Sequence, residues 1–315
     1  MGNSNKRANY HKISEEAGVS IATVSRVLNG SSKVTAETRK RVLEVMAQNG
    51  YDVAELSAIE QPKQGGLIIF HIPSMENPFY SQIAHGAKLA ARRHGYQLLI
   101  NEEHINDSTF PHLADLIRKV SAVGLIITNH IDTHLLQKLQ AMLPLVQCCE
   151  FDDTLDLPYI TIDDVEAART AMEYLLSLGK RNIAFINGPL RYKYARHRLQ
   201  GYLESLDAAG IEHNPELIVQ LPEVSYDMAV SAVTHLLNTH QPTAFFCASD
   251  VFAAAVVKAC NHAGLKVPDD VIVAGFDNIE VSYMTTPAIT TVNQQRFQMG
   301  YSSCEQLEYP IWNLC

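Results

Sequence analysis

The feature that most constrains the fold is an alternation of apolar runs with amphipathic segments over most of the chain. Short runs rich in Val, Ile, Leu and Phe indicate buried strands, and the segments between them carry apolar residues at helical spacing. Strands and helices that alternate in this way form parallel sheets covered by helices on both faces. The expected strands are 66–72, 97–101, 123–128, 145–149, 182–187, 243–248 and 271–276. The fold class is therefore predicted to be α/β, with doubly wound parallel sheets.

The alternation divides into two series, which predict two lobes of one ligand core at 66–315. The N-lobe would comprise residues 66–162 plus 293–315, and the C-lobe would comprise residues 163–292. Ligands of such sheets bind outside the carboxyl ends of the strands, so we expect a pocket between the lobes. The helices between the strands are expected at 79–94, 110–120, 134–142, 165–178, 194–209, 226–237 and 251–263.

Polar residues follow the carboxyl ends of several expected strands and are candidates for a ligand site. Carboxylate, hydroxyl and guanidinium groups beside aromatic rings suit a polyhydroxylated ligand such as a sugar or a nucleoside. Each Asp or Asn at a strand end has a second interpretation, because these residues also make turns and cap helices. The candidates are the segment Asn77-Pro78-Phe79-Tyr80, then Asp163, Arg196, Arg198, Gln200, Ser249, Asp250, Asp277 and Asn278.

The first 52 residues show a different pattern, which predicts a three-helix unit with a helix-turn-helix. Apolar residues at helical spacing end at Gly18, where a left-handed turn is easiest, and Ser20 can cap a second helix. Two helices joined by a short turn containing Gly form the helix-turn-helix signature. A third helix is expected at 36–49, after the capping residue Thr35.

The charge of the chain is divided between this amino-terminal unit and the rest. The net charge is −9, but residues 1–51 carry eight Lys and Arg against four acids, and the remainder carries 17 against 30. A positively charged amino-terminal unit on an acidic body could bind the phosphates of double-stranded DNA. The other interpretation is that four excess positive charges are only part of an ordinary solvated surface.

The second helix would act as the recognition helix in the major groove. Ile21 and Ala22 at its start can contact thymine methyl groups, and Arg26 can donate two hydrogen bonds to guanine. Short polar side chains would contact phosphates or sugars. These are Ser20, Thr23, Ser25, Asn29 and Thr38.

These residues stand in longer stretches that resemble the LacI/GalR family of bacterial transcriptional regulators. In the amino-terminal unit the stretches are AGVSIATVSRVLNG and VTAETRKRVLEVMAQNGY. In the body they are ENPFY, RLQGY, ASD, GLKVPDDVIVAGFDN and PAITTV, and the body is most similar to the cytidine and purine repressor branch. The resemblance implies a helix-turn-helix domain at 1–52 and a hinge or linker at 53–65. It also implies that the ligand core at 66–315 folds like a periplasmic binding protein.

The resemblance also implies partners and roles. A homodimer would bind a pseudo-palindromic operator, and a small-molecule effector would control this binding. Ile21, Ala22 and Arg26 would occupy the base-reading positions. The effector site implied by the resemblance consists of Phe79, Asp163, Arg198, Ser249 and Asp277.

Two segments depart from the family pattern. At the place where a hinge helix inserts an apolar wedge into the minor groove, this chain has Glu60, so Leu56 or Ile59 would have to serve as the wedge. The chain also leaves the family pattern near Leu307, and we expect reduced stability or altered assembly relative to a longer relative.

Other classes of protein find less support in the sequence. No nucleotide-binding glycine motif or nucleophile-elbow motif occurs, so no catalytic residue is expected. No metal site or cofactor is expected, because His130 and His134 lack a partner motif. No apolar run is long enough for a membrane span, which predicts a cytoplasmic protein. The six cysteines show no CxxC pattern, and Cys148 and Cys149 are expected on opposite sides of a strand. The alternative is a stand-alone sugar-binding protein with a weakened DNA-binding unit.

Overall fold

The computed structural model describes residues 12–28, 34–49 and 66–312. By their internal contacts these residues belong to two compact units, Met1–Gly65 and Gly66–Cys315. We call the first the head and the second the body. None of the described helices is long and apolar enough to cross a membrane.

The described part of the head consists of a helical segment at 12–16 followed by two longer helices, α2 (Ile21–Leu28) and α3 (Ala36–Gln48). Gly18 has a φ of +63°, which confirms the left-handed turn after the first helical segment. The Ser20 Oγ accepts a hydrogen bond from the Thr23 amide at 3.1 Å, and the Thr35 Oγ1 accepts one from the Thr38 amide at 3.3 Å. These two caps start α2 and α3 as the sequence predicts. The buried core of the head consists of Ile13, Ala17, Val24, Val27, Val42, Leu43 and Met46.

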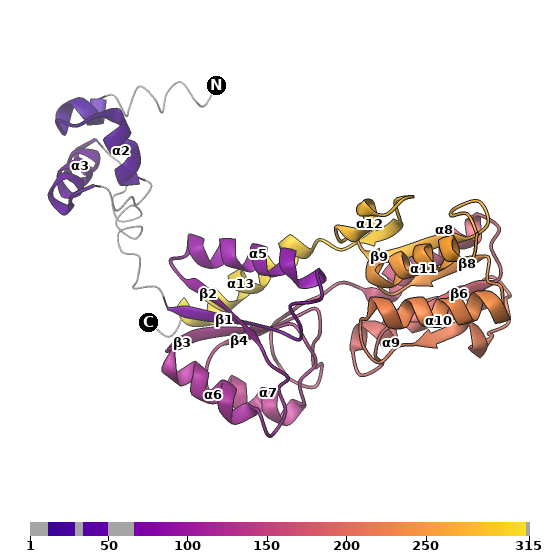
Figure 1. Cartoon of the computed structure of the whole chain (residues 1–315). Coiled ribbons are helices and arrows are strands. Elements are labelled where there is room, and N and C mark those ends of the chain that lie inside the picture. The colour runs from indigo at the N-terminus through magenta and orange to yellow at the C-terminus, as the bar shows by residue number, and fades with distance from the viewer. Residues whose placement is uncertain (1–11, 29–33, 50–65, 313–315) are drawn as a thin grey trace. The chain divides into compact units, whose positions relative to one another are not determined.

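The body contains two five-stranded sheets, and each forms the centre of one lobe (Figure 1). In the first sheet the strand order is β2-β1-β3-β4-β5, and in the second it is β10-β9-β8-β6-β7. All pairings are parallel, with Ile69 beside Leu99 and Phe185 beside Phe246 as examples of the register. The strands are β1 (Leu67–Ile72), β2 (Gln97–Glu102), β3 (Ala122–Ile127), β4 (Leu145–Cys148), β5 (Tyr159–Ile160), β6 (Ile183–Asn187), β7 (Ile218–Gln220), β8 (Ala244–Cys247), β9 (Ile272–Asp277) and β10 (Thr290–Asn293).

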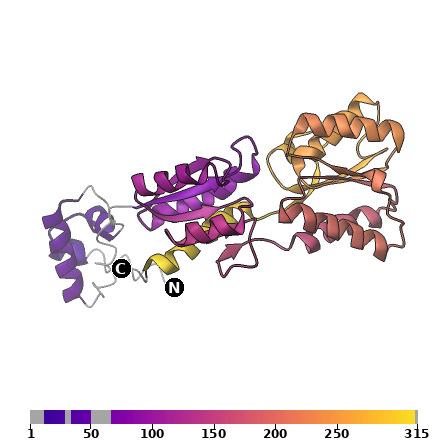
Figure 2. The ribbon, with the colours of Figure 1, turned by 90° about the horizontal axis from the view of Figure 1, so that it is seen from below.

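Helices cover both faces of each sheet, as the alternating pattern predicts. In the first lobe α5 and α13 cover one face and α6 and α7 the other, and in the second lobe α10 and α11 lie opposite α8 and α9 (Figure 2). Two short elements, η1 (Pro215–Leu217) and α12 (Val281–Met284), complete the body. The long helices are α5 (Phe79–Arg93), α6 (Phe110–Lys119), α7 (Thr133–Gln140), α8 (Asp164–Ser177), α9 (Lys193–Ala208), α10 (Tyr226–Thr239), α11 (Asp250–His262) and α13 (Arg296–Trp312).

The burial of the central strands explains why they are readable from the sequence. β1, β6 and β8 are buried along almost their whole length, so both faces of each strand need apolar residues. β5, β7 and β10 are edge strands of two to four residues, which is too short for a periodic signal. The last strand and helix return the chain from the second sheet to the first lobe.

The packing of α13 against α5 depends on two glycines. A Cβ added at Gly300 would collide with the carbonyl oxygen of Ile83, and one added at Gly86 would collide with that of Phe297. Without side chains at these positions the two helix backbones approach closely. Arg93 then donates a hydrogen bond to the Tyr301 hydroxyl at 2.6 Å across the same helix pair.

Replacement of Gly300 by Ala is expected to destabilise the body although Ala favours helices. Higher helix propensity would contribute about 1 kcal/mol of stabilisation, but the collision with the Ile83 carbonyl should cost roughly 1–3 kcal/mol more than that gain. The measurement is the urea midpoint of the full chain. The matched control is Gln298→Ala on the exposed side of α13, which should change stability by less than about 0.5 kcal/mol. A Gly300→Ala protein as stable as this control would contradict the close packing.

Candidate functional site

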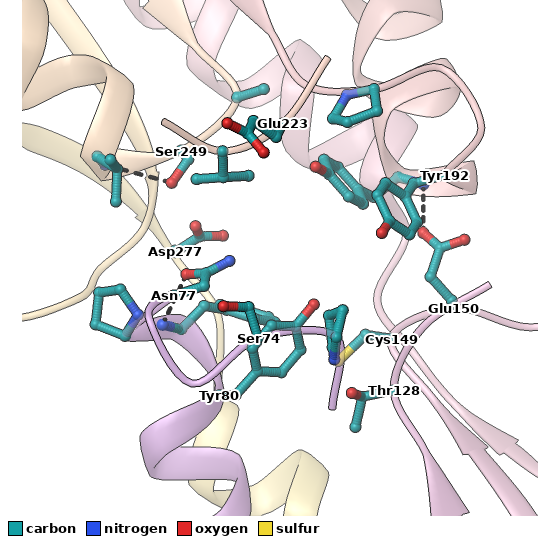
Figure 3. A pocket seen from close by; sticks show the side chains of 18 of the residues that line it. Ser74, Asn77, Tyr80, Thr128, Cys149, Glu150, Tyr192, Glu223, Ser249 and Asp277 are labelled. Atoms are coloured by element: carbon teal, nitrogen blue, oxygen red, sulfur yellow. Dashed lines mark hydrogen bonds between the residues drawn. The ribbon is translucent and has the colours of Figure 1, made fainter. Parts of the chain in front are cut away.

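A cavity of about 500 Å³ lies at the carboxyl ends of the strands of both sheets. Its walls come from the loop after β1 and the start of α5, from the ends of β3 and β4, and from the segments around α8, α9, α10 and β9. Figure 3 shows side chains from both lobes converging on this space. Parallel strands bring the loops at their carboxyl ends together, which is why residues far apart in sequence meet here.

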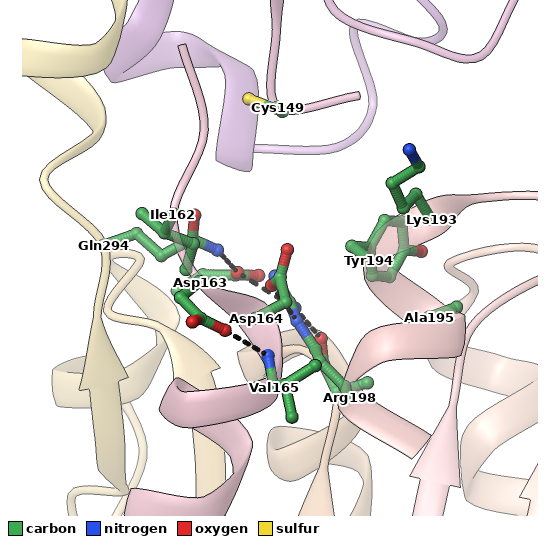
Figure 4. A network of polar contacts seen from close by, with 12 residues as sticks. Cys149, Ile162, Asp163, Asp164, Val165, Lys193, Tyr194, Ala195, Arg198 and Gln294 are labelled. Carbon is green, nitrogen blue, oxygen red and sulfur yellow. Dashed lines mark hydrogen bonds and ion pairs between the residues drawn. The ribbon is translucent and has the colours of Figure 1, made fainter. Parts of the chain in front are cut away.

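Arg198 of α9 forms the centre of the C-lobe wall. Its Nε donates a hydrogen bond to Asp164 Oδ1 at 2.8 Å, and its Nη1 donates to the Ala248 carbonyl oxygen at 2.6 Å (Figure 4). The guanidinium also lies 3.6 Å from Asp277 Oδ1 and over the ring of Phe276 at 3.5 Å. A buried guanidinium is stable only with such partners, so α8, α9, β8 and β9 are held together at one point.

Asp277 is a buried carboxyl group at the end of β9. Its backbone has a φ of +105°, a conformation that side chains other than glycine rarely adopt, and its Oδ1 accepts a hydrogen bond from Gln294 Nε2 at 2.7 Å. Burial raises the pKa of Asp277 to about 7, although the charge of Arg198 opposes this rise. Burial also raises the pKa of the neighbouring Asp250 to about 6. Near neutral pH, Asp277 can therefore either donate or accept a hydrogen bond.

Tyrosine rings supply much of the apolar surface of the cavity. Tyr192 and Tyr194 are stacked with ring centroids 5.6 Å apart, and Tyr80 packs edge-on against Phe79 at 5.2 Å. Burial raises the pKa of Tyr80 and of Tyr194 far above neutral pH, so both hydroxyls remain protonated. Flat rings with neutral hydroxyls suit the faces of sugar or base rings.

Glu150 joins the two lobes at one edge of the cavity. It follows β4 in the first lobe and lies near Tyr192 (Figure 3). Its carboxylate accepts hydrogen bonds from the backbone amides of Lys193 at 2.8 Å and Tyr194 at 3.0 Å at the start of α9. The Lys193 side chain makes a second contact with the first lobe, because its Nζ lies 3.0 Å from Asp153 Oδ2 and 3.7 Å from the centroid of the Phe151 ring. We call the contact between Glu150 and the two amides the latch.

The structure brings together four of the five residues expected to bind the effector. Phe79, Arg198, Ser249 and Asp277 line the cavity. Asp163 does not line it, because its carboxylate accepts hydrogen bonds from the amides at 165 and 166 and so caps α8. This is the second interpretation that the sequence offered for such residues. The neighbouring Asp164 lines the cavity instead and pairs with Arg198.

Several residues of the cavity could not be found by looking at strand ends alone. Glu150 follows β4, but nothing in the sequence shows that its partner is the start of a helix in the other lobe. Tyr192 and Tyr194 lie beyond the strand-end segment Gly188-Pro189. Their only sign in the sequence is that two tyrosines stand two positions apart, shortly before Arg198. Glu223, in the turn that follows the unpredicted strand β7, and Tyr226, the first residue of α10, also line the cavity.

In the head, four of the residues expected to contact DNA lie on one exposed face of α2. Ile21 is 44% exposed, and Ala22, Ser25 and Arg26 are also exposed, whereas Val24 and Val27 on the opposite side are buried. The hydroxyls of Ser20 and Thr23 lie 2.9 Å apart at the start of this face, and Thr38 Oγ1 accepts a hydrogen bond from the Thr35 hydroxyl. Asn29, Leu56 and Ile59 lie outside the described residues.

Comparison with known proteins assigns both units to one family. Residues 11–53 match the family model of bacterial regulatory proteins of the lacI family, and residues 66–313 match that of periplasmic binding proteins and the sugar-binding domain of the LacI family. The HTH-type transcriptional repressor CytR of Escherichia coli (strain K12) is 32% identical over 93% of this chain and 86% of its own length. The HTH-type transcriptional regulator DegA of Bacillus subtilis (strain 168) is 30% identical over 93% of this chain and 88% of its own length.

Solved structures of regulators are similar over nearly the whole chain. A transcriptional regulator CelR–cellobiose complex has a TM-score of 0.71 at 29% identity and covers 97% of this chain and 94% of that one. The lac repressor dimer bound to operator and the anti-inducer ONPF has a TM-score of 0.71 at 28% identity, with coverage of 96% and 92%.

The raised pKa of Asp277 predicts a specific pH dependence of stability. Between the ordinary carboxyl pKa of about 4 and the raised value, the folded protein holds a proton that the unfolded chain releases. The contribution of this group to the free energy of unfolding is therefore full at low pH and is lost as pH rises towards 7. Asn cannot ionise, so the Asp277→Asn variant does not lose this contribution. Its free energy of unfolding minus that of the parent should therefore be larger at pH 7.5 than at pH 5.

The measurement is a pair of urea titrations of the full chain at these two pH values. Asp163→Asn is the matched control, because Asn also caps helices and the exposed Asp163 lies outside the cavity. If the stability difference between Asp277→Asn and the parent stayed constant across this pH range, the burial effect would be refuted.

Proposed function

Because the chain belongs to the LacI family of bacterial regulatory proteins, we propose that it represses transcription by binding operator DNA as a dimer, under the control of a small molecule in its cavity. The observation that carries this function is the presence of both family units, head and body, in one chain. The alternative of a stand-alone binding protein gains no support, because the head matches its family model over residues 11–53 and packs a complete small core.

The exposed face of α2 is proposed to read the operator in the major groove. Arg26 can donate two parallel hydrogen bonds to a guanine, while Ile21 and Ala22 can contact thymine methyl groups. In a dimer, two such faces would read the halves of a pseudo-palindromic site.

The effector is proposed to be an uncharged polyhydroxylated molecule, a sugar or a nucleoside. Six carboxyl-bearing residues line the cavity, whereas its two arginines are already engaged, Arg198 by buried carboxylates and Arg191 by the Pro222 carbonyl and the Tyr192 ring. A phosphate group would enter a site with surplus negative charge and no unengaged guanidinium. Carboxylates accept hydrogen bonds from hydroxyl groups, and the tyrosine rings cover ring faces. The six are Glu76, Glu150, Asp164, Glu223, Asp227 and Asp277.

Control of DNA binding is proposed to run through the angle between the lobes. The effector contacts both lobes, so it can bind one lobe arrangement more tightly than another and shift the population between them. The latch at Glu150 supports this route, since it fixes one arrangement beside the cavity. By linkage, operator and effector then alter each other's affinity by the same factor.

Two narrower points complete the proposal. The cavity is proposed to bind its effector without transforming it, since the similar proteins above are named as regulators. A protein that binds bacterial operator DNA is further proposed to act in the cytoplasm.

Replacement of Arg26 by Ala is expected to weaken operator binding by roughly 1–3 kcal/mol and to relax selectivity at one guanine. The operator is first selected from a random DNA library with the parent protein, and affinities are then measured for each base at that position. Arg26→Lys is the matched control, because Lys keeps the charge but cannot make the bidentate contact. An equal loss on selected and unrelated DNA would show that Arg26 contacts only phosphates.

A thermal-shift screen of the full chain against sugars, nucleosides and their phosphorylated forms tests the effector class. A ligand at a hundredfold excess over its Kd stabilises the native state by about 2.7 kcal/mol. Uncharged compounds should raise the unfolding temperature, and Asp277→Asn should reduce this rise while Asp163→Asn leaves it unchanged. Stabilisation by a phosphorylated form as large as by its parent compound would contradict the charge argument.

A further inference from the structure

The neighbouring residues Cys148 and Cys149 bring their thiols together at the wall of the cavity. The sequence predicts that they point to opposite sides of a strand, and this prediction is wrong, because their sulfur atoms are 3.7 Å apart. The cause is the backbone of Cys149, whose φ of +71° turns the chain at the end of β4. This conformation is uncommon for a residue with a side chain and often marks a functional position.

The surroundings give the two thiols different properties. Cys148 is fully buried, whereas Cys149 is half-buried and lines the cavity. The two thiols share a contact in which either sulfur can be the donor. Cys149 stands between Cys148 and the cavity, so it is the thiol that a small molecule in the cavity meets first. Its backbone is fixed by a hydrogen bond from its amide to the Ile160 carbonyl at 2.9 Å.

We propose that Cys148 and Cys149 form a redox site that hydrogen peroxide reaching the cavity converts into a disulfide between adjacent residues. The Cys149 sulfur attacks one peroxide oxygen, the O–O bond breaks, and the departing hydroxide takes up the Cys149 proton to become water. The Cys148 sulfur then attacks the sulfur of the resulting Cys149 sulfenic acid, and the hydroxyl leaves as a second water with the Cys148 proton. One peroxide is reduced by two electrons, and two thiols are oxidised to one disulfide.

The geometry of adjacent residues makes this disulfide readily reversible. Consecutive α-carbons are about 3.8 Å apart, below the roughly 4.4–6.8 Å range of ordinary disulfides. The ring that closes between them is therefore strained, and strained disulfides are reduced more easily than structural ones. Easy reduction distinguishes a switch from a permanent crosslink.

Oxidation at this position would act on the latch. Glu150 directly follows Cys149, and its carboxylate holds the amides of Lys193 and Tyr194 in the other lobe. Closure of the ring moves the Cys149 sulfur towards Cys148 by more than an ångström, since a disulfide bond is only about 2.05 Å long. The backbone between Cys149 and Glu150 must adjust, which displaces the carboxylate from the start of α9. The redox state of the pair would then bias the same lobe arrangement as the effector.

The test treats the folded full chain, in a Cys315→Ser background, with a small molar excess of hydrogen peroxide. Remaining thiols are alkylated, and the peptide that contains both cysteines is examined by mass spectrometry. The expected product lacks two hydrogens and two alkyl groups and is restored by dithiothreitol. In Cys148→Ser the reaction should stop at the Cys149 sulfenic acid, which dimedone traps, and Cys247→Ser should behave as the parent.

Phenylarsine oxide provides a second measurement that needs no oxidation, because its arsenic binds two neighbouring thiols with loss of water. One adduct per chain is expected, and it should be lost in Cys148→Ser and in Cys149→Ser. A disulfide between Cys148 and Cys304, or oxidation confined to other cysteines, would overturn the proposed site.

Hydrogen exchange separates the site from its effect on the latch. Amides at 193 and 194 should exchange faster in the oxidised parent than in the reduced parent, and Cys149→Ser should show no such change under peroxide. Disulfide formation without faster exchange would leave the redox site standing and overturn its coupling to Glu150.

Discussion

The buried guanidinium of Arg198 is the interaction on which the ligand-binding end of the C-lobe depends. Removing such a charge from water costs several kcal/mol, and here two carboxylates, a carbonyl oxygen and an aromatic face compensate for that cost. These four partners come from three elements, namely the start of α8, the end of β8 and the end of β9, which supplies both Phe276 and Asp277. Because the buried Arg198 guanidinium must contact groups from all three elements, the positions of these elements relative to α9 are fixed. An effector that contacts Arg198 or its carboxylates meets groups that are already positioned.

The same requirement explains part of the acidic lining of the cavity. Carboxylates gather around Arg198 because an unpaired guanidinium could not remain buried, and burial raises the pKa of Asp277, with a smaller contribution from the nearby Asp250. Tyr80 lines the cavity from the first lobe, and Tyr192 and Tyr194 line it from the C-lobe. The proposed selectivity for an uncharged polyol would therefore arise from groups that also hold the C-lobe together.

Most of the fold was predictable from the sequence, because buried parallel strands and their covering helices leave strong periodic signals. The six central strands, the edge strand β2 and the caps at Ser20 and Thr35 illustrate this, since each depends on a few neighbouring residues. The edge strands β7 and β10 were not predicted, because three or four residues carry no periodicity. Within the site, the exchange of Asp163 for Asp164 shows the limit of strand-end reasoning. Adjacent carboxylates are equivalent in sequence, and only the direction of the helix start decides which one caps α8 and which one faces Arg198.

Contacts that join the two lobes were the least accessible to sequence reasoning, and the proposed control of DNA binding depends on them. The latch pairs the carboxylate of Glu150 with two backbone amides. Almost every residue type has such an amide, so the side chains at positions 193 and 194 do not predict the contact. The closeness of Cys148 and Cys149 depends on one left-handed backbone angle that strand periodicity does not anticipate. Both features lie within three consecutive residues, where the chain leaves β4 on its way to β5 of the same sheet. This turn is held by hydrogen bonds both to β5 in its own lobe and to the start of α9 in the other lobe, so a displacement here would be felt by both lobes.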